Sequence, residues 1–329
     1  MIEEKQALVA RGLRKSYGRR NALAGLSFSL TAGHVLGLLG PNGAGKTTAI
    51  RILTTILEPT AGDFSVDGIG SDHPERIRRR IGVLPESLGF PKQITALEFL
   101  TYFGQLYGLN TAAARANSLS LLQEVGLERR AKALIGTYSR GMRQRLGIAR
   151  SLISDPAVVF LDEPTLGLDP RGQQDLLQII HSIARDRNVG VLLCSHLLSE
   201  VEAICDDVVI LRLGLMVANG TVSEVVGRGP TTGMRVRVPI PLQDRARQVL
   251  DAVPEALGVT SNDQNSGWLM VQTTGQAGAS VSEGPGINNR VLNALIEADI
   301  SVLGFEAGAG HLQDAFLHLT GEAVGCPAE

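Results

Sequence analysis

A glycine-rich segment of nine residues near the N-terminus has the composition and spacing that bind phosphate groups. It satisfies the pattern G-x-x-x-x-G-K-[ST], in which backbone amides point at phosphate oxygens, a lysine reaches the β- and γ-phosphates, and a hydroxyl binds Mg²⁺. A glycine-rich turn with a surface lysine is the alternative. The pattern predicts a nucleoside triphosphate site made of Gly40, Pro41, Asn42, Gly43, Ala44, Gly45, Lys46, Thr47 and Thr48.

Two adjacent carboxylates follow an apolar run further along the chain. Residues 158–162 read as a strand that ends in Asp162, and Glu163 comes next. Because successive side chains of a strand point to opposite faces, we expect the two acids to have different roles. Asp162 should face Mg²⁺ together with Thr47, and Glu163 should act as the general base on the attacking water. A pair of surface acids after a core strand is the alternative.

The segments around these residues are those that would bring them together. Residues 35–39 read as a buried strand before the phosphate loop, and residues 48–53 begin an apolar helix. A further apolar run, residues 189–193, precedes His196. Since parallel strands deliver their carboxyl ends to one edge of a sheet, we expect an α/β fold with His196 at the phosphate edge. A packed or solvated structural histidine is the alternative.

A second helix start, at residues 138–150, has the features of an anion site. Ser139 is a good N-cap, Gly141 frees the backbone, and an apolar face follows. A second helix of the same fold is not expected to converge on the same γ-phosphate. A capped helix with exposed arginines is the alternative, and it leaves Gly141 unexplained.

Together these motifs resemble the nucleotide-binding subunit of an ATP-binding cassette (ABC) transporter. The phosphate loop, the acidic pair, Tyr17, residues 138–142, residues 166–169 and Ser195-His196 occur in family order over about residues 8–225. The resemblance implies a P-loop NTPase (RecA-like) core with a helical subdomain inserted in it. It also implies ATP as substrate and Mg²⁺ as cofactor.

The resemblance also implies roles for individual residues. Tyr17 would stack on adenine, and His196 would sense the γ-phosphate and act in catalysis with Glu163. Asp169 would couple two sites in a head-to-tail dimer, although it could also cap the turn before Pro170. In that dimer each subunit closes the ATP of its neighbour with a signature loop, here Ser139, Arg140, Gly141 and Met142.

The chain departs from the family pattern at two places. The usual signature Leu-Ser-Gly-Gly-Gln is altered at Tyr138, Arg140 and Met142, a variant that resembles ABC ATPases serving ABC-2-type export permeases. Glu86 stands where the family usually has a glutamine that contacts the metal or water. A carboxylate at position 86 can still offer an oxygen to Mg²⁺, and it adds negative charge beside the metal.

Composition limits the partners. The chain has 31 basic and 33 acidic residues and a net charge of −2, so we expect no nucleic acid partner. No run of about 18 apolar residues is present and no secretion signal starts the chain, so the pore would be another polypeptide. Cys194, Cys205 and Cys326 are scattered and read as reduced thiols. We expect a cytoplasmic protein held at the inner face of the membrane by its permease.

A change in the composition and pattern of the sequence near residue 227 divides the chain into two domains. Residues 1–226 form the expected nucleotide-binding domain, with the helical subdomain at about 89–150 against the membrane subunit. Residues 227–329 form a small C-terminal α+β domain with an accessory or regulatory role.

Within this C-terminal domain, the sequence pattern predicts several elements. A half-buried strand would carry Met234, Val236, Val238 and Ile240 on one face. A helix is expected at 291–298 and a strand at 300–305, and residues 274–286 read as a flexible loop.

The function predicted from these observations is the ATP-hydrolysing subunit of an ABC transporter. It would dimerise, most simply with a second copy of itself, on two ATP molecules and power a separate permease, with export of the ABC-2 type. The alternative is a soluble ABC-type ATPase acting on nucleic acid or ribosomes, but such relatives usually carry a long coiled-coil insertion or two cassettes. A small-molecule P-loop kinase would not account for residues 139–142 and His196 together.

Overall fold

Five of the apolar runs form the parallel part of a six-stranded sheet. Its order is β10-β9-β3-β8-β7-β6, with β10 antiparallel to β9 at one edge. β3 and β8 are buried at every position, as expected for central strands covered on both faces. The strands are β3 (Val35–Leu39), β6 (Ile81–Leu84), β7 (Val158–Asp162), β8 (Gly190–Cys194), β9 (Asp207–Arg212) and β10 (Leu215–Thr221).

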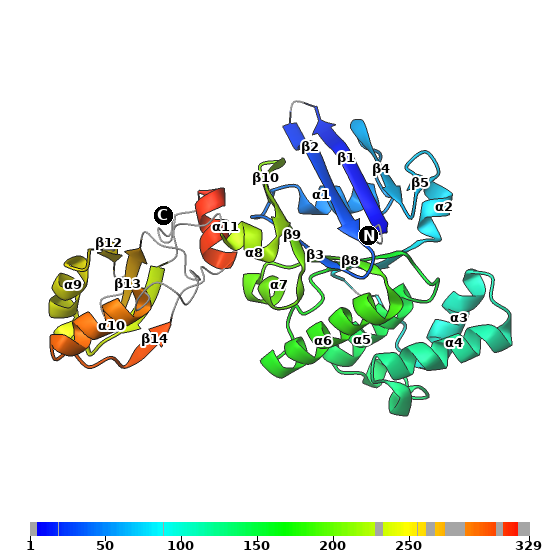
Figure 1. The fold of residues 1–329 in the computed structure, drawn as a ribbon. Coiled ribbons are helices and arrows are strands. Elements are labelled where there is room, and N and C mark those ends of the chain that lie inside the picture. Colours follow the sequence, from blue (N-terminus) through cyan, green and yellow to red (C-terminus); the bar gives the residue numbers. More distant parts are fainter. Residues whose placement is uncertain are drawn as a thin grey trace. The chain divides into compact units, whose positions relative to one another are not determined.

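The computed structural model describes residues 5–18, 20–87, 89–227, 233–254, 256–260, 267–273, 287–306 and 312–321. The chain divides into two compact units, residues 1–221 and 222–329 (Figure 1). The domains proposed from the sequence, 1–226 and 227–329, differ from this division by the five residues of α8 (Val222–Val226). α8 falls in the second unit, where it packs against α11 (Leu312–Thr320).

A second, antiparallel sheet and four helices surround the central sheet of the first unit. Large buried side chains such as Leu36, Ile52 and Phe160 fill its core. The second sheet has the order β2-β1-β4-β5. Its strands are β1 (Gln6–Tyr17), β2 (Arg20–Thr31), β4 (Ala61–Val66) and β5 (Ile69–Gly70), and the helices are α1 (Lys46–Leu53), α2 (Pro74–Arg78), α6 (Pro170–Arg187) and α7 (Leu198–Ile204).

The helical insertion consists of α3 (Ala96–Leu106), α4 (Thr111–Glu124) and α5 (Arg140–Ser151), joined by short turns at Glu128–Arg130 and Ile135–Thr137. Side chains cap each helix at its start. Thr95 forms a capping box with Glu98, Asn110 accepts from the Ala113 amide, and Ser139 accepts from the Met142 amide. Figure 1 shows α3 and α4 side by side. The insertion is therefore made of locally specified helices.

The second unit has the order β-α-β-β-α-β of a ferredoxin-like fold. Its antiparallel sheet runs β12-β13-β11-β14, and the core contains Val236, Leu250, Val271 and Leu295. The elements are β11 (Gly233–Arg237), a turn at Ile240–Leu242, α9 (Gln243–Asp251), β12 (Ala256–Thr260), β13 (Trp268–Thr273), α10 (Ile287–Glu297) and β14 (Gly304–Glu306).

Two details of this unit differ from the sequence prediction. Met234, Val236 and Val238 are buried, but Ile240 is 53% exposed because Pro239 and Pro241 replace the strand with a 3₁₀ turn after Arg237. The final strand is confined to Gly304–Glu306. The loop predicted at residues 274–286 lies outside the described residues. Within the described ranges, no helix is long and apolar enough to cross a bilayer.

Candidate active site

The carboxyl ends of four parallel strands bring the predicted chemical groups to one edge of the central sheet. The phosphate loop follows β3, and Glu163 follows β7. His196 comes two residues after β8, and Glu86 comes two residues after β6. Since β8 pairs with both β3 and β7, the phosphate loop, Glu163 and His196 leave neighbouring strands. The sheet thus assembles groups that are far apart in the sequence.

The phosphate loop has a backbone that glycine alone fits easily. Gly45 has a φ of 112° and precedes α1, and a Cβ there would lie 2.6 Å from the carbonyl oxygen of Ala22. No side chain caps α1, so its first amides are directed at the loop without a local acceptor. The Lys46 ammonium donates to the carbonyl oxygens of Gly40 and Pro41 and therefore lies over the loop. This arrangement suits a bound anion.

Asp162, the last residue of β7, sits among charged groups. Burial raises the pKa of its carboxyl, and the negative charges of Glu163 and Glu86 raise it further, while Lys46 and Arg51 oppose the shift. Negative charge is therefore concentrated beside the lysine that the motif assigns to phosphate. A divalent cation at this place would offset that charge.

Glu163 and His196 are in direct contact. Oε2 of Glu163 lies 2.6 Å from Nδ1 of His196. Glu163 has a φ of 49°, an unusual value for a residue with a side chain, and its amide donates to the carbonyl oxygen of Cys194 at 2.9 Å. Nδ1–H donates a hydrogen bond to the carboxylate, and Nε2 donates to a ligand when it also carries a proton. The His196 side chain is 55% exposed. The pair is therefore held by β7 and β8 and reaches solvent.

The signature loop packs against the segment that follows Glu163 in the same chain. Ser139 Oγ accepts the Met142 amide at 3.2 Å. The guanidinium of Arg140 lies against Gly167, where a Cβ would come within 2.5 Å of Arg140 Cζ. Leu168 lies next to Gly141 in the same way. The variant residue Arg140 thus has a partner in its own chain, and the contact of this loop with a neighbour's ATP stays a prediction.

The change to tyrosine at position 138 also has a local explanation. Tyr138 is 3% exposed, and its hydroxyl donates to the carbonyl oxygen of Arg130 at 2.8 Å. The ring fills a core position of the helical insertion while its polar atom is satisfied. The departure from leucine is therefore accommodated without disturbing Ser139.

The remaining predicted residues lie at the surface. Tyr17 is 51% exposed at the end of β1, with the Lys15 ammonium 5.6 Å from the centre of its ring. Thr47 is exposed on the first turn of α1, and Glu86 is exposed. Asp169 is the N-cap residue of α6, but its carboxylate makes no capping hydrogen bond, so the helix start leaves this side chain available.

The sequence did not identify one buried polar group beside the site. Glu200 of α7 is 5% exposed, and its Oε2 accepts from the hydroxyls of Thr165 and Ser195, each at 2.8 Å. Thr165 and Ser195 are both 1% exposed. Glu200 lies four residues after His196 on a short helix. From the sequence alone, a glutamate at such a position is expected to be exposed to solvent. Its burial depends on the packing of α7, which the sequence pattern does not show.

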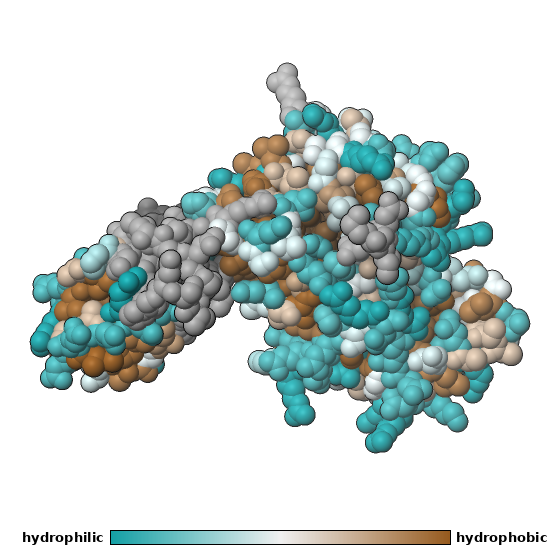
Figure 2. Space-filling view, in the orientation of Figure 1, coloured by the Kyte–Doolittle hydropathy of each residue, from teal (hydrophilic) through white to brown (hydrophobic). Residues whose placement is uncertain are grey.

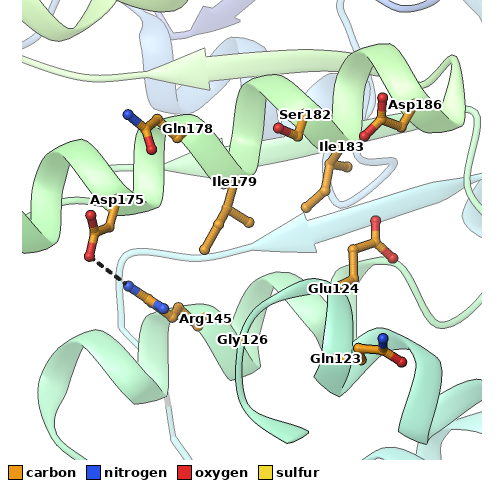
Figure 3. A pocket seen from close by; sticks show the side chains of 10 residues that line it. All are labelled: Gln123, Glu124, Gly126, Arg145, Asp175, Gln178, Ile179, Ser182, Ile183 and Asp186. Carbon is orange, nitrogen blue, oxygen red and sulfur yellow. Dashed lines mark hydrogen bonds and ion pairs between the residues drawn. The ribbon is translucent and has the colours of Figure 1, made fainter.

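A separate groove of about 420 Å³ lies between α4, α5 and α6 (Figure 3). Arg145 Nη2 lies 3.2 Å from Asp175 Oδ2 across it, and Glu124 on its wall is paired with Arg187 outside it. With Asp186 included, acidic side chains outnumber basic ones in the lining. A groove of this charge does not suit a triphosphate, whereas the cradle at the sheet edge does.

Comparisons with known proteins agree with this arrangement. The model of the family described as ABC transporter matches residues 23–166. The doxorubicin resistance ATP-binding protein DrrA of Mycobacterium tuberculosis (strain ATCC 25618 / H37Rv) is 38% identical over 261 residues, covering 78% of this chain and 77% of that protein. The daunorubicin/doxorubicin resistance ATP-binding protein DrrA of Streptomyces peucetius is 34% identical over 318 residues, covering 96% and 93%.

Solved structures show the same similarity. An ATP-binding subunit of an ABC transporter has a TM-score of 0.59 and 33% identity, covering 67% of this chain and 91% of the other. An ATP-binding cassette solved as a dimer in a post-hydrolysis state with ADP and Pi has a TM-score of 0.58 and 24% identity, covering 65% and 98%. The predicted P-loop NTPase fold is confirmed.

Proposed function

The chain belongs to the family of ABC transporter ATP-binding subunits, and from this membership we propose that it closes as a dimer on two ATP molecules and powers a separate export permease. It is an ATPase. The observation that carries the proposal is the convergence of the phosphate loop, Asp162 and the Glu163–His196 pair on one sheet edge. That edge offers an anion cradle, a concentrated negative charge and a carboxylate held by an imidazole.

Mg²⁺ fits the oxygen groups at this edge. It prefers hydroxyl, carboxylate and phosphate oxygens, and we assign its protein ligands to Thr47, Asp162 and Glu86. In the described ranges, no group of three His, Cys, Asp or Glu side chains is placed to hold a metal alone, so the nucleotide would complete the shell. When bound, Mg²⁺ neutralises charge that develops on the phosphate oxygens.

The residues of this chain then act as follows. The backbone N–H groups of Gly40 and of residues 42–48, with the Lys46 ammonium, hold the phosphates, and Tyr17 stacks on adenine. Glu163 accepts a proton from the attacking water. His196 orients that carboxylate through Nδ1–H, and when the imidazole carries both protons its Nε2–H donates to a γ-phosphate oxygen. The 2.6 Å contact between Glu163 and His196 supports a joint role of the two residues in one catalytic step.

The dimer is supported by the position of the signature loop. Ser139, Gly141 and the rest of this loop begin α5, and in the proposed dimer they close the ATP of the neighbouring copy. Asp169 follows the segment that Arg140 touches and has no capping bond of its own, which suits a role in coupling the two sites. Because the chain carries both Glu163 and the signature loop, two identical copies would form two complete sites.

The helical insertion is the proposed contact with the permease. Tyr102, Leu106 and Tyr107 are exposed at or beside the end of α3, with 57%, 62% and 46% of each residue accessible. Figure 2 shows apolar surface among polar surface over α3 and α4. Docking there would hold the protein at the cytoplasmic face of the membrane.

Export is supported by the relatives, whose names include drug resistance ATP-binding proteins and a bacitracin transport ATP-binding protein. The same relatives favour transport over the alternative left open by the sequence, an ATPase acting on nucleic acid or ribosomes. The net charge of −2 also provides no field for a polyanion.

The experiment is affinity purification of the tagged chain from membranes and from RNA-containing extracts. We expect an integral membrane protein to copurify with the wild type and to be lost from the variant Leu106→Asp, while ATP hydrolysis by the isolated variant stays within about twofold. Retention on RNA without a membrane protein would contradict the proposal.

A further inference from the structure

Glu200 joins the two loops that carry Glu163 and His196. Thr165, two residues after Glu163, donates to Glu200 Oε2 at 2.8 Å. Ser195, directly before His196, donates to the same oxygen at 2.8 Å. Ser195 Oγ also accepts the Leu197 amide at 3.1 Å. A single carboxylate oxygen is therefore bonded to both loops.

Glu200 is buried to a degree that is unusual for a glutamate. The residue is 5% exposed, and among the described residues it has no salt bridge. Its second oxygen, Oε1, is buried without a hydrogen-bond partner in the same part of the chain. A buried carboxylate that accepts two hydroxyls but meets no cation contributes little to stability. The arrangement calls for a role other than stability.

That role follows from the backbone it fixes. Glu163 is held at a φ of 49°, a conformation that persists only when its surroundings enforce it. Behind Glu163, the turn is closed by the bond from the Leu166 amide to the Glu163 carbonyl at 3.2 Å. Glu200 fixes Thr165 inside this turn and fixes Ser195 on the other side. Any relative shift of the two loops would change the 2.6 Å contact between Glu163 and His196.

We propose that Glu200 is a positioning residue for ATP hydrolysis, which acts by tying the loop after β7 to the loop after β8 through Thr165 and Ser195. It touches neither the phosphates nor the water. The inference rests on the proposed roles of Glu163 and His196. It adds Glu200, which has no part in the proposed function described above. In the closed dimer the same tie would carry a shift of residues 165–169 to His196.

The first test compares Glu200→Ala with Glu200→Gln. The glutamine keeps an oxygen that can accept both hydroxyls, whereas the alanine removes it. We expect kcat to fall about 10- to 100-fold in Glu200→Ala, with KM for ATP changed less than about twofold, because misplacement of reacting groups affects the transition state. Glu200→Gln should retain kcat within about threefold of the wild type.

The second test uses smaller changes that keep the fold. Thr165→Val removes one hydroxyl with little change of shape, and we expect it to lower kcat about 5- to 10-fold. Added to Glu200→Ala, it should change kcat by less than about twofold, because the acceptor is already gone. Thr320→Val is the matched control, since Thr320 is also 1% exposed and its hydroxyl bonds the Phe316 carbonyl at 2.7 Å in the second unit. That control should leave kcat within about twofold.

Two results would overturn the inference. Thr165→Val and Glu200→Ala could each lower the melting temperature while kcat per folded dimer stays that of the wild type, which would mean a purely structural role. Their effects on kcat could also multiply in the double variant, which would mean independent action. If the wild type did not hydrolyse ATP at all, the proposed function would be contradicted, and the role of Glu200 would fall with it.

Discussion

Two helix starts in this protein are predicted to bind the same ligand, yet they are built differently. α1 begins at Lys46 after the N-cap residue Gly45, no side chain caps it, and the Lys46 ammonium covers the loop before it. α5 begins at Arg140 after the N-cap residue Ser139, whose hydroxyl already accepts a hydrogen bond from the Met142 amide. The first start is preorganised for an anion, whereas the second is satisfied within its own chain. The comparison predicts that the phosphate loop can bind ATP within one chain, and that the signature loop contributes only when a second subunit supplies the phosphate.

The largest expected effect is on the rate of ATP hydrolysis, and it comes from Glu163, which lies in the same chain as the phosphate loop. Glu163→Gln keeps the shape of the side chain but removes the base, so hydrolysis should fall by about 10²- to 10⁴-fold. ATP binding should persist, because residues 40–48 are unchanged. Single-turnover kinetics and nucleotide binding measure both. Full hydrolysis by this variant would contradict the assignment of Glu163.

The backbone of the phosphate loop gives the next largest effect. Gly45→Ala places a Cβ 2.6 Å from the Ala22 carbonyl oxygen at a φ of 112°, so the loop must shift and ATP affinity should fall about 100-fold. Calorimetric titration with ATP measures this.

Gly108→Ala is the control for Gly45→Ala. Gly108 also has a positive φ, 92°, but a Cβ there meets nothing within 4 Å. We expect this variant to lose about 1 kcal/mol of stability and no ATP affinity. Equal loss of affinity in both variants would show that general strain is responsible and not the loop.

The signature loop is tested by a change of intermediate size. Ser139→Ala removes the cap of α5 and the hydroxyl proposed to reach the neighbour's ATP. It should cost about 1 kcal/mol of stability and lower steady-state hydrolysis about 10-fold. Urea unfolding and ATPase assays at several protein concentrations measure the two effects.

Asn110→Ala is the matched control for the cap. Asn110 caps α4 through the Ala113 amide at 2.9 Å, so this variant loses the same kind of bond elsewhere. We expect the same loss of stability with hydrolysis unchanged. If both variants hydrolyse ATP alike, the hydroxyl of Ser139 is only a cap, and the comparison between the two helix starts fails.

The smallest expected effect is on the stability of the nucleotide-free protein. The raised pKa of Asp162 means that the folded state holds this proton more tightly than the unfolded chain, in which the carboxyl has its ordinary pKa of 3.8. The free energy of unfolding therefore falls as pH rises from 3.8 through the folded pKa, and the penalty is complete above it. Asp162→Asn should raise the melting temperature at pH 7 and change it little below pH 3.8.

Differential scanning at several pH values measures the stability. A lower melting temperature at pH 7 would show that the Asp162 carboxylate stabilises the empty site.

The sequence could predict the parts of this site that are encoded locally. The phosphate loop, Asp162 and the helix cap at Ser139 are specified by residues within a few positions of each other, so their pattern was enough. Strand order and resemblance predicted that His196 lies at the same sheet edge as Glu163, but not that the two side chains are in contact. The Arg140–Gly167 packing and the burial of Glu200 depend on contacts between segments distant in sequence. The hydrophobic periodicity within one segment does not indicate such contacts. The prediction that Ile240 continues the strand was wrong for a local reason. The two prolines beside it end the strand, although Ile240 fits the alternating apolar pattern.

The most direct test of the central claim is the mass in solution of the Glu163→Gln variant, measured by light scattering with and without Mg-ATP. A monomer has a mass of 34.9 kDa, and we predict that the mass doubles when ATP is bound and hydrolysis is blocked. The added variant Ser139→Ala should weaken this dimer. A monomer with ATP demonstrably bound would contradict closure of the site by a second copy of this chain.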